Sequence, residues 1–79
     1  MGEVVAAYAA YKQADADALL ARWRARARLG RAVESEYDGG KGSTLKSIAA
    51  KLGVVDEQVF RYRRAYKEWT EKRPSDSLD

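Results

Sequence analysis

The chain has 79 residues, which is the length of one small domain with a thin hydrophobic core. It contains neither cysteine nor histidine, so disulfide bonds, thiolate nucleophiles, imidazole bases and the usual zinc ligand sets are excluded. The net charge of +3 is unevenly distributed, because residues 1–38 sum to zero whereas residues 39–74 carry nine basic and four acidic side chains.

This composition bears on function and location. A basic excess confined to one half is typical of a nucleic-acid-binding surface, although a lysine-rich solvated surface gives a similar count. The carboxylates are scattered and no nucleophile stands out, so we do not expect an enzyme, and nothing predicts a metal, a cofactor or a small-molecule ligand. No apolar run approaches the ~20 residues that span a bilayer and no leader peptide is evident, so we expect a cytoplasmic protein without membrane contact.

Four helices and no strands are predicted. The first spans about Glu3 to Gln13, with one apolar stripe of Val4, Tyr8 and Tyr11 at helical spacing. The second continues to about Tyr37, and either of two aspartates, Asp15 or Asp17, can serve as its N-cap. A single helix over residues 3–38 is the alternative, although it is unusually long for a globular domain.

The second helix is expected to face the core with residues that share about a third of its circumference: Leu19, Leu20, Trp23, Ala27, Gly30 and Tyr37. Gly30 in a helix interior indicates either close approach of another helix or a tolerated surface glycine. Five arginines lie within ten residues, at positions 22, 24, 26, 28 and 31. We interpret them as a solvated face whose stems cover apolar surface, with some contacts to phosphate left open.

Two segments are predicted to be irregular. Residues 38–43 form a loop because three of them are glycines, and this loop lacks the strand and spacing of a nucleotide-binding P-loop. After Pro74 the tail, residues 74–79, has nothing to bury, and we expect it to be disordered.

The segment from Ser43 onward predicts a tight pair of helices. Ser43 or Thr44 caps a short helix that ends near Leu52, where Gly53 can adopt the left-handed conformation. A second helix follows within three residues and extends to about Lys72, so the two helices must cross steeply. The residues expected to fill the crossing are Ile48, Ala49, Leu52, Val54, Val59 and Tyr62.

The pattern Ile48-Ala49, three residues, Gly53-Val54, four residues, Val59, and then Tyr62 resembles the bacterial and phage helix-turn-helix family of DNA-binding domains. The resemblance covers about 20 of the 79 residues. It implies an all-α fold of three to four helices over residues 1–73, with the helix-turn-helix at about 44–64. It also implies that the long C-terminal helix enters the DNA major groove as the recognition helix.

Under this resemblance, one side of the recognition helix packs on the core through Val55, Val59, Tyr62, Tyr66 and Trp69. The expected base-reading residues are Glu57, Gln58, Phe60, Arg61 and Arg64. The expected phosphate contacts are Lys41, Ser43, Thr44, Lys46, Arg63 and Lys67. The family commonly has a capping serine or threonine where Val55 stands here, so Asp56 is expected to cap instead, and the acidic pair Asp56-Glu57 repels phosphate unless one accepts from cytosine.

We therefore predict a sequence-specific binder of double-stranded DNA, associated with the nucleoid, that acts as a transcriptional regulator or a replication or partition factor of a bacterium, phage or plasmid. The alternative is a helical protein-interaction or assembly module, such as the DNA-recognising small subunit of a larger machine. A homodimer is expected because operators of this family are two-fold symmetric. Two apolar faces can supply its interface: Ala18, Ala21, Ala25, Leu29 and Ala32, or Val4, Tyr8 and Tyr11.

Overall fold

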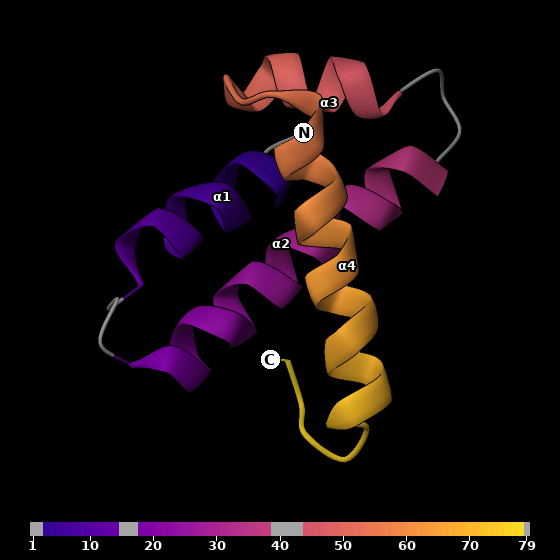
Figure 1. The fold of residues 1–79 in the computed structure, drawn as a ribbon. Coiled ribbons are helices and arrows are strands. Elements are labelled where there is room, and N and C mark those ends of the chain that lie inside the picture. Colours follow the sequence, from indigo (N-terminus) through magenta and orange to yellow (C-terminus); the bar gives the residue numbers. More distant parts are fainter. Residues whose placement is uncertain (1–2, 15–17, 39–43, 79) are drawn as a thin grey trace.

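A computed structural model describes residues 3–14, 18–38 and 44–78, and within these ranges the fold contains helices and no strands (Figure 1). The helices are α1 (Glu3–Gln13), α2 (Leu19–Asp38), α3 (Leu45–Leu52) and α4 (Asp56–Lys72). In Figure 1 α1 and α2 lie side by side, α4 crosses α2, and α3 lies across the start of α4. The all-helical prediction is confirmed.

The first two helices are separate elements. They pack against one another along their lengths, which a continuous rod over residues 3–38 cannot do, so that alternative is wrong. The N-caps proposed for the second helix, Asp15 and Asp17, lie outside the described residues.

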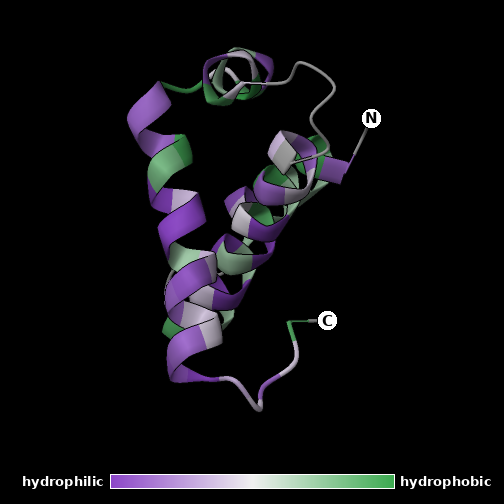
Figure 2. Cartoon of the chain, turned by 90° about the vertical axis from the view of Figure 1, so that its right-hand side faces the viewer, coloured by the Kyte–Doolittle hydropathy of each residue, from purple (hydrophilic) through white to green (hydrophobic). Residues whose placement is uncertain are grey.

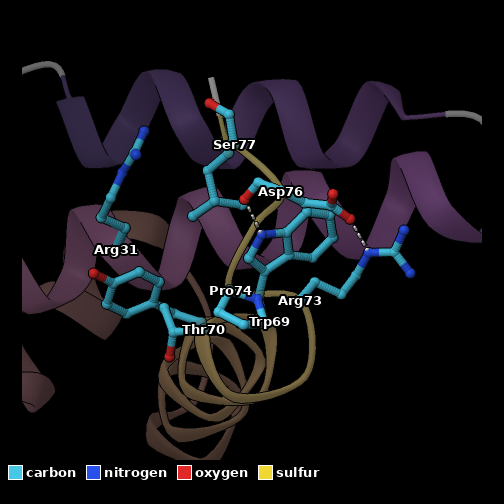
Figure 3. Close-up of a pocket in the computed structure, with 9 residues that line it drawn as sticks. Arg31, Trp69, Thr70, Arg73, Pro74, Asp76 and Ser77 are labelled. Carbon is cyan, nitrogen blue, oxygen red and sulfur yellow. Dashed lines mark hydrogen bonds and ion pairs between the residues drawn. The ribbon is translucent and has the colours of Figure 1, made fainter.

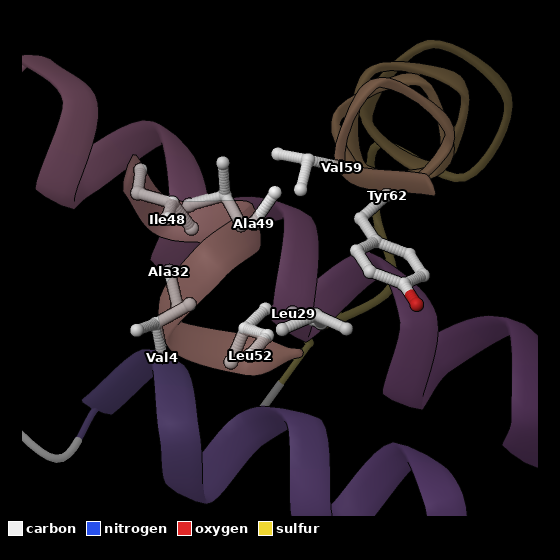
Figure 4. Packing of buried hydrophobic residues seen from close by; sticks show 9 residues of the cluster. Val4, Leu29, Ala32, Ile48, Ala49, Leu52, Val59 and Tyr62 are labelled. Carbon is white, nitrogen blue, oxygen red and sulfur yellow. The ribbon is translucent and has the colours of Figure 1, made fainter. Parts of the chain in front are cut away.

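The main hydrophobic core draws on all four helices (Figure 4). Its buried members are Val4, Leu29, Ala32, Val33, Ile48, Ala49, Leu52, Val59 and Tyr62. Two tyrosines of α1, Tyr8 and Tyr11, pack on this core, and their ring centroids lie 6.4 and 5.6 Å from that of Tyr62. The predicted α1 stripe therefore faces inward, and Val4, which is fully buried, cannot supply a dimer interface.

The buried side of α2 differs in part from the prediction. Ala27 and Gly30 are buried as expected, but Leu19, Leu20 and Tyr37 are exposed. The residues that replace them in the interior are Leu29, Ala32 and Val33. The physical reason is that α2 is contacted by α1, α3 and α4, so its buried surface is wider than one stripe. Leu29 and Ala32 are thereby removed from the proposed dimer surface.

Gly30 marks the closest approach of α2 to α4. A Cβ atom built on it would lie 2.7 Å from the carbonyl carbon of Tyr62 and 2.9 Å from the Cβ of Tyr66. Real Cβ contacts are essentially never this short. The prediction that another helix approaches at this glycine is confirmed, and the surface-glycine alternative is wrong.

The pair α3 and α4 forms as its sequence signals predict. The Thr44 hydroxyl accepts from the amide of Ser47 at 3.0 Å, and the Ser47 hydroxyl oxygen accepts from the amide of Thr44 at 2.9 Å, which makes a capping box. Gly53 ends α3 in the left-handed region, at φ 73°. In Figure 2 α3 is seen along its axis while α4 runs down the picture, so the two helices cross steeply.

Two expectations at the start of α4 are wrong. Val55 is 63% exposed and does not join the core stripe, and Ala65 is buried on that side instead. Val55 also occupies the N-cap position, Asp56 is the first helical residue, and no side chain caps the helix. Asp56 therefore does not shift the helix start.

The C-terminal segment folds back onto the helices, so the expectation that the tail has nothing to bury is wrong for residues 74–78 (Figure 3). Leu78 is buried in a second cluster with Ala27 and Trp69, and Trp23 and Tyr66 pack against it. The indole Nε1 of Trp69 donates to the carbonyl oxygen of Asp76 at 3.2 Å, and Arg28 donates to the carbonyl oxygen of Leu78. The sequence contains a single apolar residue after Pro74, and the two tryptophans provide the surface that buries it.

Candidate nucleic-acid interface

The outer side of α4 is the side that lies opposite its buried residues. Val59, Tyr62, Ala65 and Trp69 hold the helix to the rest of the domain at helical spacing. The opposite and flanking positions are exposed, and they include all five residues predicted to read bases: Glu57, Gln58, Phe60, Arg61 and Arg64. Lys67 lies on the same exposed side, one turn further along.

Four of these residues gather around one shallow hollow of about 200 Å³, lined by Glu57, Phe60, Arg61 and Arg64. The Phe60 ring is 54% exposed, which leaves a large apolar side chain between two guanidinium groups and one carboxylate. No carboxylate of the described residues forms an ion pair with Arg61 or Arg64. This hollow combines hydrogen-bond donors, one acceptor and an apolar surface, which are the groups that base edges require.

Gln58 lies on the flank of the outer side and is joined to the core. Its Oε1 accepts a hydrogen bond from the hydroxyl of Tyr62 at 3.2 Å. Burial raises the pKa of Tyr62 above its usual value, the nearby phenols of Tyr8 and Tyr11 raise it further, and Arg26 opposes this rise. Tyr62 therefore remains a protonated donor at neutral pH, and Gln58 keeps its amide nitrogen for another partner.

The residues predicted to contact phosphate are not brought together as one set. Lys41 and Ser43 lie outside the described residues, and Lys46 is exposed on α3. The Thr44 hydroxyl accepts from the Ser47 amide and is occupied by capping.

Arg63, another residue predicted to contact phosphate, is turned toward α2. Its Nε donates to the Oε2 of Glu34 at 2.7 Å, and its guanidinium lies 5.2 Å from the ring centroid of Tyr37. With a carboxylate already paired to it, Arg63 is a weak candidate for phosphate contact. Its role in the structure is to join α4 to α2.

Three of the five arginines of α2 cover aromatic surface, which agrees with the predicted shielding of apolar surface by arginine stems. Arg22 and Arg26 lie over the ring of Tyr11, at 4.8 and 5.5 Å from its centroid. Arg24 lies 5.7 Å from the ring centroid of Trp69, and its buried Nε has no hydrogen-bond partner within the part of the chain that the structure describes. Each contact is a cation–π interaction in which the arginine stem shields an aromatic ring.

The sequence analysis missed that Arg26 borders the outer side of α4. A hollow of about 130 Å³ is lined by Tyr11, Arg26, Gln58, Arg61 and Tyr62, so residues of α1 and α2 extend the exposed surface of α4 sideways. The only sequence signal for this was the spacing of Arg22 and Arg26, four residues apart on one side of α2. Their neighbourhood depends on how α1 folds back, which that spacing does not specify.

Within the described residues, no three acidic side chains lie close enough to hold a metal ion, and no helix is both long and apolar enough to cross a bilayer. The surface that stands out is the outer side of α4 with its flanking arginines. Searches with the sequence and the fold found no matching protein-family model, curated protein or solved structure.

Proposed function

We propose that this chain binds double-stranded DNA and that α4 enters the major groove with its outer side toward the bases. The observation that carries the proposal is the exposed state of Arg61 and Arg64, which have no carboxylate partner among the described residues, beside Phe60 on a helix whose other side is buried. Guanidinium groups match the O6 and N7 acceptors of guanine, and an aromatic ring can contact the methyl group of thymine.

The relation of α3 to α4 supports the same proposal. The two helices are separated by residues 53–55 and cross steeply, so α3 lies across the start of α4 and leaves the outer side of α4 open (Figure 2). Helix-turn-helix proteins present their recognition helix to DNA in this manner. The acidic start, Asp56 and Glu57, suits the helix dipole and gives α4 an acceptor for cytosine.

Affinity for duplexes tests the proposal. Selection from a random duplex pool at low salt should enrich one sequence class, and log affinity for it should fall linearly with log salt concentration. Arg64→Gln should weaken binding to the selected duplex by about 5- to 150-fold, the equivalent of the 1–3 kcal/mol of one bidentate base contact. Lys72→Gln removes the same charge at the far end of α4 and should change affinity little.

Two results would contradict the proposal. One is that the wild-type chain retains no duplex even at low salt, which would favour a helical protein-interaction module. The other is an equal loss of affinity for Arg64→Gln and Lys72→Gln, which would mean that net charge alone drives binding.

A regulatory, replication or partition role and a homodimer remain parts of this proposal. Because Val4, Leu29 and Ala32 are interior residues, a dimer must use other surfaces. Sedimentation equilibrium at increasing concentration tests it, and a monomer throughout would remove the two-fold operator from the proposal.

A further inference from the structure

The paired and unpaired cations of the domain lie in different places. The described ion pairs join α3 to α2, α4 to α2 and the C-terminal segment to itself: Lys51–Glu36, Arg63–Glu34 and Arg73–Asp76. Five arginines have no carboxylate partner among the described residues: Arg22, Arg24, Arg26, Arg61 and Arg64. Arg26, Arg61 and Arg64 line the surface where α1 and α2 meet the outer side of α4, and Arg22 shares the Tyr11 hydroxyl with Arg26.

Arg26, Arg61 and Arg64 line a groove built from two hollows that share Arg26 and Arg61. The first is the 130 Å³ hollow beside Tyr11, and the second, of about 240 Å³, is also lined by Trp23, Arg64 and Glu68. We call the two together the arginine groove. Glu68 is the only carboxylate that lines it in the described part of the chain. Three guanidinium groups against one carboxylate, beside aromatic walls, give the groove a net positive potential.

Tyr11 holds two of the guanidinium groups in place. Its hydroxyl oxygen accepts from Arg22 at 3.4 Å and from Arg26 at 3.2 Å, while both groups also lie over its ring. A phenol is a neutral acceptor, so these contacts fix the arginines without cancelling their charge. An anion that binds to them therefore immobilises less side chain than it would on free arginines.

The arginine groove also continues into the hollow on the outer side of α4, because Arg61 and Arg64 line both. A ligand along α4 can thus extend from one to the other. Guanidinium groups bind phosphate with two parallel hydrogen bonds, and a backbone phosphate presents two non-bridging oxygens that can accept them.

We propose that the arginine groove binds a backbone phosphate of the DNA whose bases face α4. This inference rests on the proposed function, and it names Arg26 as the α2 arginine that makes a phosphate contact, a possibility that the sequence left open. It assigns Arg61 to phosphate together with Arg26, and it leaves Arg64 to the bases.

The first experiment compares variants that each remove one positive charge. Affinities of Arg26→Gln, Arg61→Gln and Lys72→Gln are measured over a range of salt concentrations on two duplexes of unrelated sequence. Arg26→Gln and Arg61→Gln should each reduce the slope of log affinity against log salt by about 0.9, the value for one phosphate contact, and should weaken both duplexes by the same factor. Lys72→Gln should keep the wild-type slope.

Arg26 contacts Tyr11, so its loss can also disturb the fold. Arg26→Lys keeps the charge, so this variant should retain most of the salt slope. Arg61 is exposed, so the thermal unfolding of the Arg61→Gln variant should match that of the wild type. A wild-type slope in both glutamine variants, or a loss on one duplex only, overturns the assignment to phosphate.

A second experiment does not depend on DNA. Inorganic pyrophosphate is titrated into the wild-type chain while the Nε–Hε NMR signals of arginine are recorded. The signals of Arg26 and Arg61 should shift and saturate, whereas Arg63, which is paired with Glu34, should stay unchanged. Absence of a saturating shift overturns the groove as an anion site even where DNA binds. A saturating shift in a chain that binds no duplex would keep the anion site and refute both the DNA ligand and the proposed function.

Discussion

The contact between α2 and α4 at Gly30 predicts whether Gly30→Ala raises or lowers the free energy of unfolding. In Gly30→Ala, the added methyl group would meet the backbone carbonyl of Tyr62 and the Cβ of Tyr66, both closer than real Cβ contacts come. Neither group is the flexible end of a side chain, so rotation cannot relieve the clash. The two helices must move apart instead.

Two effects oppose each other in this variant. Alanine is favoured over glycine in a helix interior by about 0.8–1 kcal/mol, which would stabilise α2. Overpacking costs about 1–3 kcal/mol, backbone shifts included, and Gly30→Ala lies at the upper end because the added atom meets backbone, so the clash dominates. We expect a net loss near 2 kcal/mol, and for a chain of this size that lowers the melting temperature by roughly 8–16 °C.

Urea and thermal denaturation followed by circular dichroism at 222 nm measure this loss. Ala21→Gly, at an exposed position of the same helix, is the matched control and should lose about 1 kcal/mol through helix propensity alone. A Gly30→Ala variant that is more stable than the wild type would mean that propensity decides the outcome. The close approach of α2 and α4 would then be refuted, and with it the position of the outer side of α4.

Three further substitutions test other contacts by urea denaturation. Leu78→Ala should reduce the free energy of unfolding by about 2 kcal/mol because it empties the cluster around Trp69, and an unchanged value would mean that the tail does not pack. Thr44→Ala should lose about 1 kcal/mol with the capping box, while Thr44→Ser should keep it; equal losses would exclude the hydroxyl bond to Ser47. Burial favours the neutral phenol of Tyr62, so wild-type stability should be complete below pH 10 and fall above it. Tyr62→Phe should lack most of that alkaline loss, and an identical loss would place its origin elsewhere.

The α3–α4 pair could be predicted because its signals are local. Thr44 caps through a residue three positions along, and Gly53 stops α3 through its own backbone conformation. The buried positions Ile48, Ala49 and Val59 follow from helical spacing once the crossing is assumed. None of these features requires knowledge of α1 or α2.

The parts that could not be predicted depend on distant neighbours. Leu29 and Leu19 are equally apolar, and only the positions of α1 and α4 decide that the first is buried and the second exposed. Leu78 has no apolar neighbour in sequence and is buried because Trp69 and Ala27 lie beside it in space. The candidate site has the same limitation, since Arg26 borders Arg61 only after α1 brings Tyr11 between α2 and α4.

Under the proposed function, the two hydrophobic clusters explain why the middle of α4 is the part suited to bind DNA. The main core holds the first half of the helix through Val59 and Tyr62, and the second cluster holds its last turns through Trp69. Arg61 and Arg64 lie between these anchors, on a stretch of helix that is fixed at both ends and open on its outer side. A contact made there needs little reordering of the backbone, so little of its binding free energy is offset by lost conformational entropy. Under the proposed function, loosening the helix at Val59 or Trp69 should therefore weaken DNA binding even though both side chains lie on the buried side of α4.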